Sequence, residues 1–235
     1  MKNLVYIVAI NMDVNNHAKL AWESYCRKHN LDFKIITESS DNRMAPHWER
    51  YTVIERYPDY DNYLYVDADA LVKWDAPNFF EELPYNKMYA VQDIGSLEWT
   101  ANSIKGYQDL FPKTEIKWWD YFTTGFLKFN KKHRLKLREF IKFHQENEFE
   151  INNRQYNTLR KGFDQTPFNY FVKQENIEYE LAPAVFSLAH LHKKDIFQNG
   201  MFVELGYIWQ FNGIPHEHRE QIMEHIWNTY KENYE

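Results

Sequence analysis

Residues 63–72, YLYVDADALV, place two aspartates between two apolar runs. The first run, 63–66, is aromatic and β-branched, which is typical of a buried strand. Two carboxylates one residue apart raise each other's pKa and destabilise the site unless a cation joins them. Asp67 and Asp69 therefore predict a site for a hard divalent cation, Mn2+ or Mg2+, that also takes phosphate oxygens. As a bare pattern Asp-x-Asp also occurs in solvated loops, and the strand before it favours the metal.

Strands and helices alternate on both sides of this stretch. The predicted strands are 4–10, 32–37, 63–66, 88–91 and 125–129, and the predicted helices are 18–29, 47–57, 134–144, 164–174 and 217–235. Alternation of this kind predicts an α/β fold with a central, mostly parallel sheet flanked by helices. In such sheets ligands bind beyond the carboxyl ends of the strands. Asp67 and Asp69 stand at one of those ends.

The chain shows no internal repeat and no Gly/Ser linker, so we expect a single domain over residues 1–235. Residues 94–122 mix Gly, Trp and charges without clean periodicity and form a possible acceptor-side insertion. Trp99, Trp118 and Trp119 in this segment suit the apolar faces of sugars. They are equally compatible with an interaction surface or with the segment's own core.

Composition restricts the class of protein. The formal net charge of -6 argues against a broad basic surface for nucleic acid. The single cysteine, Cys26, rules out an intrachain disulfide and fits a reducing compartment. No segment reaches the 18 or so apolar residues that a membrane span needs. We therefore expect a soluble, cytoplasmic protein.

Residues 47–77, HWERYTVIERYPDYDNYLYVDADALVKWDAP, resemble the Asp-x-Asp region of GT-A fold glycosyltransferases. They are most similar to the retaining family 8 type (glycogenin and lipopolysaccharide galactosyltransferases) and the related family 34 type. The resemblance implies a GT-A, Rossmann-like fold and a metal-dependent hexosyl- or pentosyltransferase that uses a nucleotide-sugar, most commonly a UDP-sugar, with retention of anomeric configuration. It implies that Asp67 and Asp69 bind the metal and that Asp67, Ala68 and Arg50 contact the donor. A solvated helix charge is the alternative for Arg50.

Two further islands follow in the family's order. Asp93, just after the predicted strand 88–91, resembles the Asp that contacts the donor sugar. Thr124 and Gly125 resemble the segment that starts a strand beneath the sugar, although Thr123 stands where Asn is usual. The resemblance implies that Asp93, Thr124 and Gly125 bind the donor.

Two more stretches complete the implied site. Asp164 and Gln165 resemble the Asp-Gln pair that opens a helix near the anomeric carbon, and the resemblance implies a catalytic role for both. Asp164 would also serve as a simple helix cap, which is the alternative. Ala9, Ile10 and Asn11, at the end of the first predicted strand, are expected to hold the nucleoside.

The last island departs from the family pattern. Gln210 stands where the family has a metal-binding His, Gly213 matches the family's Gly as a donor-binding residue, and no Lys follows. Other histidines occur nearby. We name His190, His192 and His216 as substitutes for the third metal ligand.

The acceptor is not specified by these residues. A glycan, a protein and a modified DNA base all remain open, because the basic run 129–138, FNKKHRLKLR, leaves nucleic acid possible. A second hypothesis is a non-catalytic member of the fold that binds nucleotide or glycan. A third is a phosphatase of the haloacid dehalogenase type, which requires Thr where this chain has Ala70.

Overall fold

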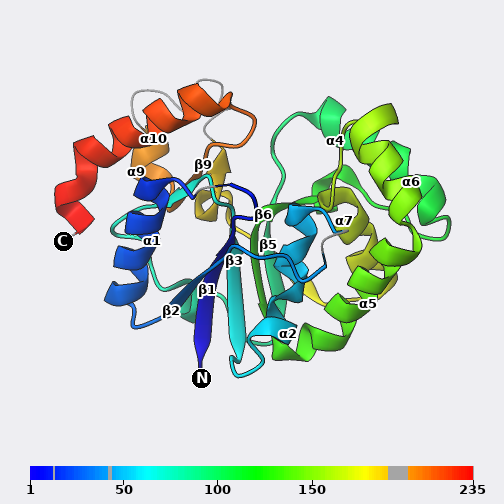
Figure 1. Ribbon diagram of the computed structural model, residues 1–235, viewed down its shortest axis with the longest axis horizontal. Helices are drawn as coiled ribbons and strands as arrows, with labels where there is room; N and C mark the ends of the chain where they lie inside the picture. Colours follow the sequence, from blue (N-terminus) through cyan, green and yellow to red (C-terminus); the bar gives the residue numbers. More distant parts are fainter. Residues whose placement is uncertain (13, 42–43, 190–200, 235) are drawn as a thin grey trace.

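A twisted sheet lies at the centre of the molecule, with helices on both sides (Figure 1). The computed structural model describes residues 1–12, 14–41, 44–189 and 201–234. The main sheet has six strands. In spatial order they are β2 (Asp32–Ile36), β1 (Asn3–Val8), β3 (Asn62–Val66), β6 (Phe122–Asn130), β5 (Met88–Gln92) and β7 (Tyr179–Ala182).

Strand direction decides which residues meet at the upper edge of this sheet, by which we mean the side where β1, β3 and β5 end. All neighbouring strands are parallel except β6, which is antiparallel to both β3 and β5, so the prediction of a mostly parallel sheet is confirmed. Because β6 runs backwards, its beginning lies at the carboxyl ends of the other strands. Its register with β5 shifts between Ala90 and Val91, and such irregularities commonly re-aim side chains next to active sites.

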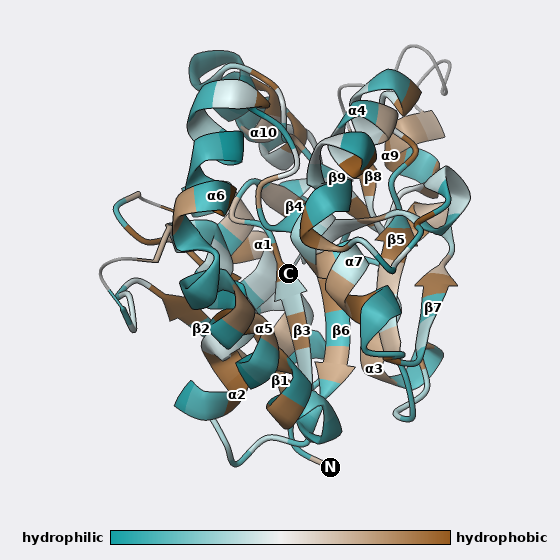
Figure 2. Cartoon of the chain, turned by 90° about the vertical axis from the view of Figure 1, so that its right-hand side faces the viewer, coloured by the Kyte–Doolittle hydropathy of each residue, from teal (hydrophilic) through white to brown (hydrophobic). Residues whose placement is uncertain are grey.

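Both faces of the sheet are buried, which is why β1 reads as a continuous apolar run. Val5 and Ile7 belong to the apolar cluster on one face, and Leu4 and Tyr6 to the cluster on the other. This alternation follows from the two-residue period of a strand. Figure 2 shows the hydrophobic colours on strands such as β2 and β5 and the hydrophilic colours on outer helices such as α6 (Glu148–Asn153).

The helices divide between the two faces. One side carries α1 (Asn16–Lys28), α9 (Met201–Leu205) and α10 (His216–Tyr230), and the other carries η1 (Pro46–Thr52), α2 (Val53–Arg56), α4 (Leu97–Tyr107), α5 (Arg134–Glu146) and α7 (Gln165–Gln174) (Figure 1). A short helix α3 (Phe79–Glu82) precedes β5, and a π-helical turn, Arg154–Thr158, follows α6. None of the helices in these described ranges is long and apolar enough to cross a membrane.

A small second sheet was not predicted from the sequence. It consists of β4 (Ala70–Val72), β9 (Ile208–Gln210) and β8 (Leu188–Ala189), in that order. Ala70 lies opposite Gln210 in the antiparallel β4–β9 pair. This register brings the C-terminal region next to residues 67–69, which contain Asp67 and Asp69 and end where β4 begins. We call these three residues the acidic turn.

Residues 94–122 contain a regular helix that the sequence analysis did not identify. Helix α4 starts at the cap residue Ser96, whose Oγ accepts a hydrogen bond from the amide of Trp99 at 3.2 Å. Its buried face is formed by Thr100, Ser103 and Tyr107. Thr100 and Ser103 are small polar residues, so the apolar period that signals a helix is absent.

Candidate active site

The acidic turn joins the two sheets. The amide of Asp67 donates to the carbonyl of Gly125 in β6 at 3.2 Å, while the carbonyl of Asp69 accepts from the amide of Phe211, just after β9, at 3.0 Å. The Tyr65 hydroxyl donates to Asp67 Oδ1 at 2.7 Å. Each aspartate is thus fixed through its backbone to a different sheet.

Asp69 carries an electrostatic cost in this position. Burial and the neighbouring charge of Asp67 raise the pKa of its carboxyl to about 6, and Arg219 acts in the opposite direction. Arg219, in α10, places Nη1 2.5 Å from Asp69 Oδ2. The sequence analysis missed Arg219. It lies 150 residues from Asp69 in the chain, and nothing in its local pattern signals the contact.

Arg50 lies beneath the turn and is not the solvated helix charge considered as its alternative. It is only 7% exposed. Its Nη1 donates to the Thr124 carbonyl at 2.7 Å and lies 3.5 Å from Asp67 Oδ1, its Nε lies 3.5 Å from Asp164 Oδ2, and its guanidinium covers the Tyr65 ring at 4.3 Å. Burial opposes the charge, but the carboxylate of Asp164, the Tyr65 side chain and Asp67 outweigh it and raise the pKa of Arg50.

Asp164 does not act as a helix cap. It precedes α7, but its side chain makes no capping hydrogen bond. Instead the carboxylate is 3% exposed, and its Oδ2 accepts from the Tyr51 hydroxyl at 2.6 Å in addition to facing Arg50. The buried Asp164 therefore holds Arg50 and Tyr51 in place.

Gln165, expected to be catalytic, contacts two of the residues expected to bind the donor, Asp93 and Thr124. Its Nε2 donates to Asp93 Oδ2 at 2.8 Å, and its Oε1 accepts from the Thr124 amide at 3.3 Å. The other oxygen of Asp93 accepts from the amide of Gly95 at 2.9 Å, so the carboxylate has a fixed orientation. Asp93 just after β5, Thr124 in β6 and Gln165 in α7 thus meet at one point on this edge of the sheet.

Gly125 leaves space that Asp67 and Gln210 fill. A Cβ at Gly125 would lie 2.5 Å from Asp67 Oδ2 and 2.6 Å from both polar atoms of the Gln210 amide, so either side chain would have to move to admit it. The Gln210 side chain is 3% exposed, and within the described residues its Nε2 has no hydrogen-bond partner. The unpartnered atom is an N–H donor beside Asp67, so it calls for an acceptor such as a phosphate oxygen and not for a cation. The Gln210 amide oxygen, with those of Asp67 and Asp69, forms a set of hard donors that fits Mg2+ or Mn2+.

Of the histidines named as substitutes, only His216 can be placed. His190 and His192 lie outside the described residues. The His216 side chain is 73% exposed, and its Nε2 faces Glu220 at 4.0 Å. Across the described ranges no group of three or more His, Cys, Asp and Glu side chains could hold a metal. His216 belongs to no such group among these residues, so the structure does not support it as the third ligand.

An open cavity of about 590 Å³ adjoins the ends of β1 and β2. Ile10 and Asn11, two of the residues expected to hold the nucleoside, line it together with Thr37, Glu38 and further residues of the following loop and of α6. Asn11 has a φ of 56°, a left-handed conformation that Asn tolerates better than most residues. Ala9 does not line this cavity. It is 2% exposed and packs in the core, where its amide donates to the Ile36 carbonyl at 2.8 Å.

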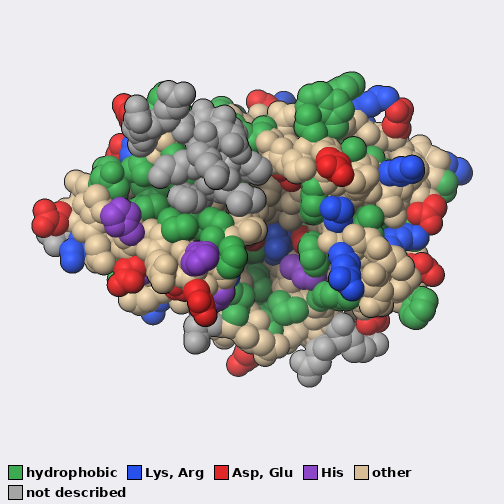
Figure 3. Space-filling model, turned by 90° about the horizontal axis from the view of Figure 1, so that it is seen from above, with side chains coloured by type: hydrophobic (Ala, Val, Ile, Leu, Met, Phe, Trp, Pro, Cys, Tyr) green, Lys and Arg blue, Asp and Glu red, His purple; other side chains and the backbone are tan. Residues whose placement is uncertain are grey.

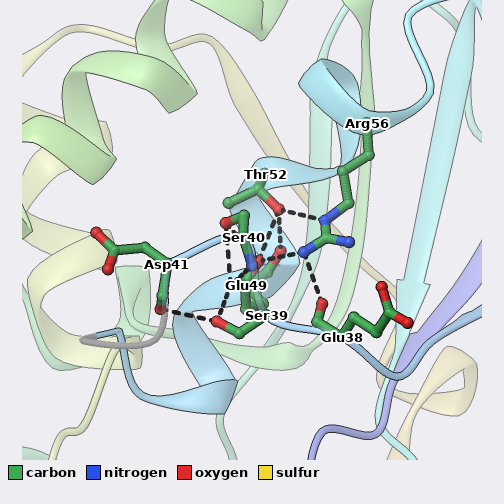
Figure 4. A network of polar contacts seen from close by, with 7 residues as sticks. All are labelled: Glu38, Ser39, Ser40, Asp41, Glu49, Thr52 and Arg56. Carbon is green, nitrogen blue, oxygen red and sulfur yellow. Dashed lines mark hydrogen bonds and ion pairs between the residues drawn. The ribbon is translucent and has the colours of Figure 1, made fainter.

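A buried glutamate fixes the wall of this cavity (Figure 4). Glu49 Oε1 accepts from the Ser39 hydroxyl and the Ser40 amide, both at 2.5 Å, and Oε2 lies 3.2 Å from Arg56 Nη2. Burial alone would raise the pKa of Glu49, but these donors and Thr52 hold it below its ordinary value. The loop after β2, which borders the cavity, is therefore rigidly anchored to η1.

Seen from above, the molecular surface is hollowed near its middle, and basic, acidic and histidine side chains gather around the hollow (Figure 3). Ala68 lies in the acidic turn and is 9% exposed. Gly213 lies in the exposed turn between β9 and α10, with a φ of 74°.

The basic run 129–138 lies elsewhere. It follows the end of β6, where Asn130 pairs with Asn62 at the opposite edge of the sheet. Several of its charges are also paired with acidic residues: Lys131 with Asp61, Arg134 and Arg138 with Glu55, and Lys136 with Glu175. This run therefore does not extend the site, and it gives no support to a nucleic-acid acceptor.

Comparison by sequence identifies no relative: no protein-family model matches the chain, and no curated protein does. Solved structures do match. A glycosyltransferase involved in the glycosylation of the major capsid of PBCV-1 has a TM-score of 0.63 at 14% identity, over 94% of this chain and 98% of its own. The bifunctional glycosyltransferase WbbM has a TM-score of 0.59 at 13% identity, over 91% of this chain and 46% of its own.

A third match is the galactosyltransferase LgtC, in complex with donor and acceptor sugar analogs. Its TM-score is 0.56 at 14% identity, over 98% of this chain and 99% of its own. The phosphatase alternative is dropped, because the shared architecture is that of glycosyltransferases. At such low identity the likeness establishes the fold and leaves the reaction open. The fold expected from residues 47–77 is confirmed: this chain has the GT-A glycosyltransferase fold.

Proposed function

We propose that the chain is a metal-dependent glycosyltransferase that moves a hexosyl or pentosyl group from a nucleotide-sugar, with UDP as the nucleotide, to an acceptor with retention of anomeric configuration. One observation carries the proposal. The acidic turn, Asp93 and Gln165 come from separate elements and meet at one sheet edge, beside an open cavity. Structural roles alone would not require so many acidic and amide groups in one place.

The donor would lie along this edge. The nucleoside would occupy the cavity at Ile10 and Asn11, and the sugar would lie between Asp93 and Gln165. A carboxylate accepts two hydroxyl hydrogen bonds at once, and the bond from Gln165 already orients Asp93 for this. Gly125 allows Asp67 and Gln210 to approach the backbone of β6 beneath the diphosphate.

Asp67, Asp69 and the Gln210 amide oxygen would hold Mn2+ or Mg2+. When bound, the cation would neutralise the diphosphate and stabilise the charge that leaves with it. This chain's own contribution is to fix the backbones of Asp67 and Asp69 through hydrogen bonds to both sheets, and to hold the Gln210 amide near the Asp67 carboxylate.

In the transfer step the bond between the anomeric carbon and the phosphate oxygen breaks, and its electron pair leaves with the nucleoside diphosphate. The acceptor hydroxyl oxygen bonds to the anomeric carbon on the same face, and its proton passes to the departing phosphate. Gln165 is the residue placed to stabilise the cationic sugar through its amide oxygen. Asp164, buried against Arg50, positions that arginine and contributes its charge at longer range.

The proposal is tested by ligand-induced thermal stabilisation with UDP, GDP and TDP, each with and without Mn2+. We expect the largest shift with UDP plus Mn2+, because a ligand that binds only the folded state stabilises it by an amount that grows with the logarithm of its concentration relative to Kd. Free-sugar release from a panel of UDP-sugars then reports turnover, with Asp69→Asn as the control that loses both signals.

The two readouts separate the remaining alternatives. Stabilisation without sugar release in the presence of a broad acceptor panel would favour the non-catalytic nucleotide-binding protein. If no nucleoside diphosphate stabilises the chain in the presence of Mn2+, the glycosyltransferase proposal is wrong.

A further inference from the structure

Arg219 is held at the acidic turn by a single interaction. Its contact with Asp69 Oδ2 is the only ion pair or side-chain hydrogen bond of Arg219 within the described residues. The Arg219 side chain is 19% exposed and that of Asp69 18% exposed, so solvent reaches both. Release of Asp69 breaks only this one side-chain contact, and a divalent cation at the same carboxylate would replace the positive charge that Arg219 withdraws.

The helix that carries Arg219 is anchored independently of that contact. Met223 and Ile226 of α10 are buried in the apolar cluster that also contains α1. Tyr230, at the end of the helix, stacks on Trp74 with ring centroids 4.9 Å apart. Arg219 can therefore release Asp69 by changing its side-chain rotamer, while α10 stays in place.

A second contact from the same turn of α10 reaches the opposite side of the donor region. Asn15 donates to the carboxylate of Glu220, and the same Asn15 caps α1 by accepting from the amide of Ala18 at 3.1 Å. Asn15 follows the loop that begins with the cavity residue Asn11. Arg219 and Glu220 thus tie α10 both to the acidic turn and to the β1–α1 loop.

We propose that Arg219 changes its binding partner when ligands enter the site. It neutralises Asp69 in the empty site, gives up this carboxylate when a divalent cation binds there, and then pairs with the diphosphate of the nucleotide. The inference rests on the proposed function and adds to it a residue that no sequence pattern identified. Its physical basis is that Arg219 and a cation compete for the same oxygen, whereas Arg219 and a phosphate attract each other.

The two halves of this exchange have opposite consequences for one substitution. Arg219→Gln removes the competitor at Asp69, so Mn2+ alone should bind about fivefold more tightly. The same substitution removes a charge-assisted contact with the diphosphate, so UDP should bind about tenfold more weakly at saturating Mn2+. Arg219→Lys keeps the charge and should lie between the wild type and Arg219→Gln in both measurements.

Mn2+ affinity is measured by electron paramagnetic resonance of the free ion, and UDP affinity by isothermal titration calorimetry. Lys231→Gln is the matched control, because it removes one positive charge from an exposed site just after α10. It should leave both affinities unchanged. Asp69→Asn should abolish Mn2+ binding in the first assay.

The outcomes are distinguishable. If Arg219→Gln weakens both affinities or changes neither, Arg219 is only a structural tether and the inference is overturned. The inference also fails if Mn2+ does not bind the wild type. If Mn2+ binds as expected but UDP does not bind the wild type at all, the proposed function fails, while the Mn2+ measurements still decide whether Arg219 competes for Asp69.

Discussion

Arg50 and Arg219 flank the acidic turn and are held in opposite ways. Arg50 is 7% exposed, donates to two backbone carbonyls, those of His47 and Thr124, and faces two carboxylates. Arg219 is partly exposed and faces one carboxylate, that of Asp69. The first arginine belongs to the rigid framework of the site, and the second is available for exchange.

The contrast follows from desolvation. A buried arginine must keep nearly all its partners, because an uncompensated charge in the interior costs several kcal/mol. An ion pair open to solvent contributes about 1 kcal/mol or less, since water replaces the lost partner. A site that must bind and release a charged ligand therefore needs both types, one to fix the geometry and one to respond.

The largest effect is expected from Arg50→Met, which fills similar space without charge. It leaves Asp164 and Asp67 without their buried counter-charge, and should lower the free energy of unfolding by about 3–5 kcal/mol. Urea denaturation measures this change. Arg138→Met is the control, because the Arg138 side chain is 59% exposed, and it should cost about 0.5 kcal/mol or less. An Arg50→Met protein whose free energy of unfolding lies within about 1 kcal/mol of the wild-type value would contradict the structural role of Arg50.

Gly125→Ala should have the next largest effect. Its Cβ would collide with Asp67 Oδ2 and the Gln210 amide, and such overpacking costs about 1–3 kcal/mol. Mn2+ binding should be lost as well, because the two side chains are pushed apart. In a Gln210→Ala background the same substitution should lower the free energy of unfolding by less, since one of the two side chains in the way is gone. Equal costs in both backgrounds, measured by urea denaturation, would show that Gln210 does not border Gly125.

The contrast between the two arginines also explains how much of the site the sequence could predict. Asp67, Asp69, Asp93 and Gln165 stand at the ends of elements that have strong local patterns, so their place at the sheet edge follows from the alternation of strands and helices. The burial of Arg50 was not predictable, because its environment comes from residues far along the chain.

The C-terminal half of the site depends on long-range register. Gln210 reaches the acidic turn only because β9 pairs with β4, and both strands have three residues, too few for a clear pattern. Arg219 reaches Asp69 only through the packing of α10 against α1. Neither contact has a local signal. The substitution of Gln for His was visible in the sequence, but its buried, unpartnered amide was not.

Acidification should destabilise the Arg50 side of the site through His144, whereas protonation of Asp69 on the Arg219 side acts in the opposite direction. His144 stacks on Trp48 of η1 at 4.0 Å, and burial, followed by the charge of His47, lowers its pKa to about 4. The unfolded chain binds this proton below about pH 6.5, so stability from the neutral ring is complete above that pH and is lost as pH falls toward 4. The loss should be about 1–2 kcal/mol by pH 5.

His144→Phe tests this assignment because it keeps an aromatic ring against Trp48 and removes the titrating group. Chemical denaturation at pH 7 and pH 5 should show a smaller acid-induced loss of stability for the variant than for the wild type. His218→Phe, an exposed change at the start of α10, is the control and should leave the pH dependence unaltered. If the free energy of unfolding of His144→Phe falls from pH 7 to pH 5 as much as that of the wild type, the acid sensitivity belongs to another group.

The smallest effect on stability is expected at residues outside both arginine networks. Trp118 and Trp119 are 49% and 51% exposed, so they are not the core of their own segment. Replacing both with Ala should change the free energy of unfolding by about 0.5 kcal/mol or less per site. If they form an acceptor platform, KM for the acceptor should rise while UDP affinity stays constant. The exposed Leu135→Ala is the control, because it lies at the opposite edge of the sheet. A fall in UDP affinity would connect the two tryptophans to the donor, and the separation between a rigid donor framework and an independent acceptor surface would then be wrong.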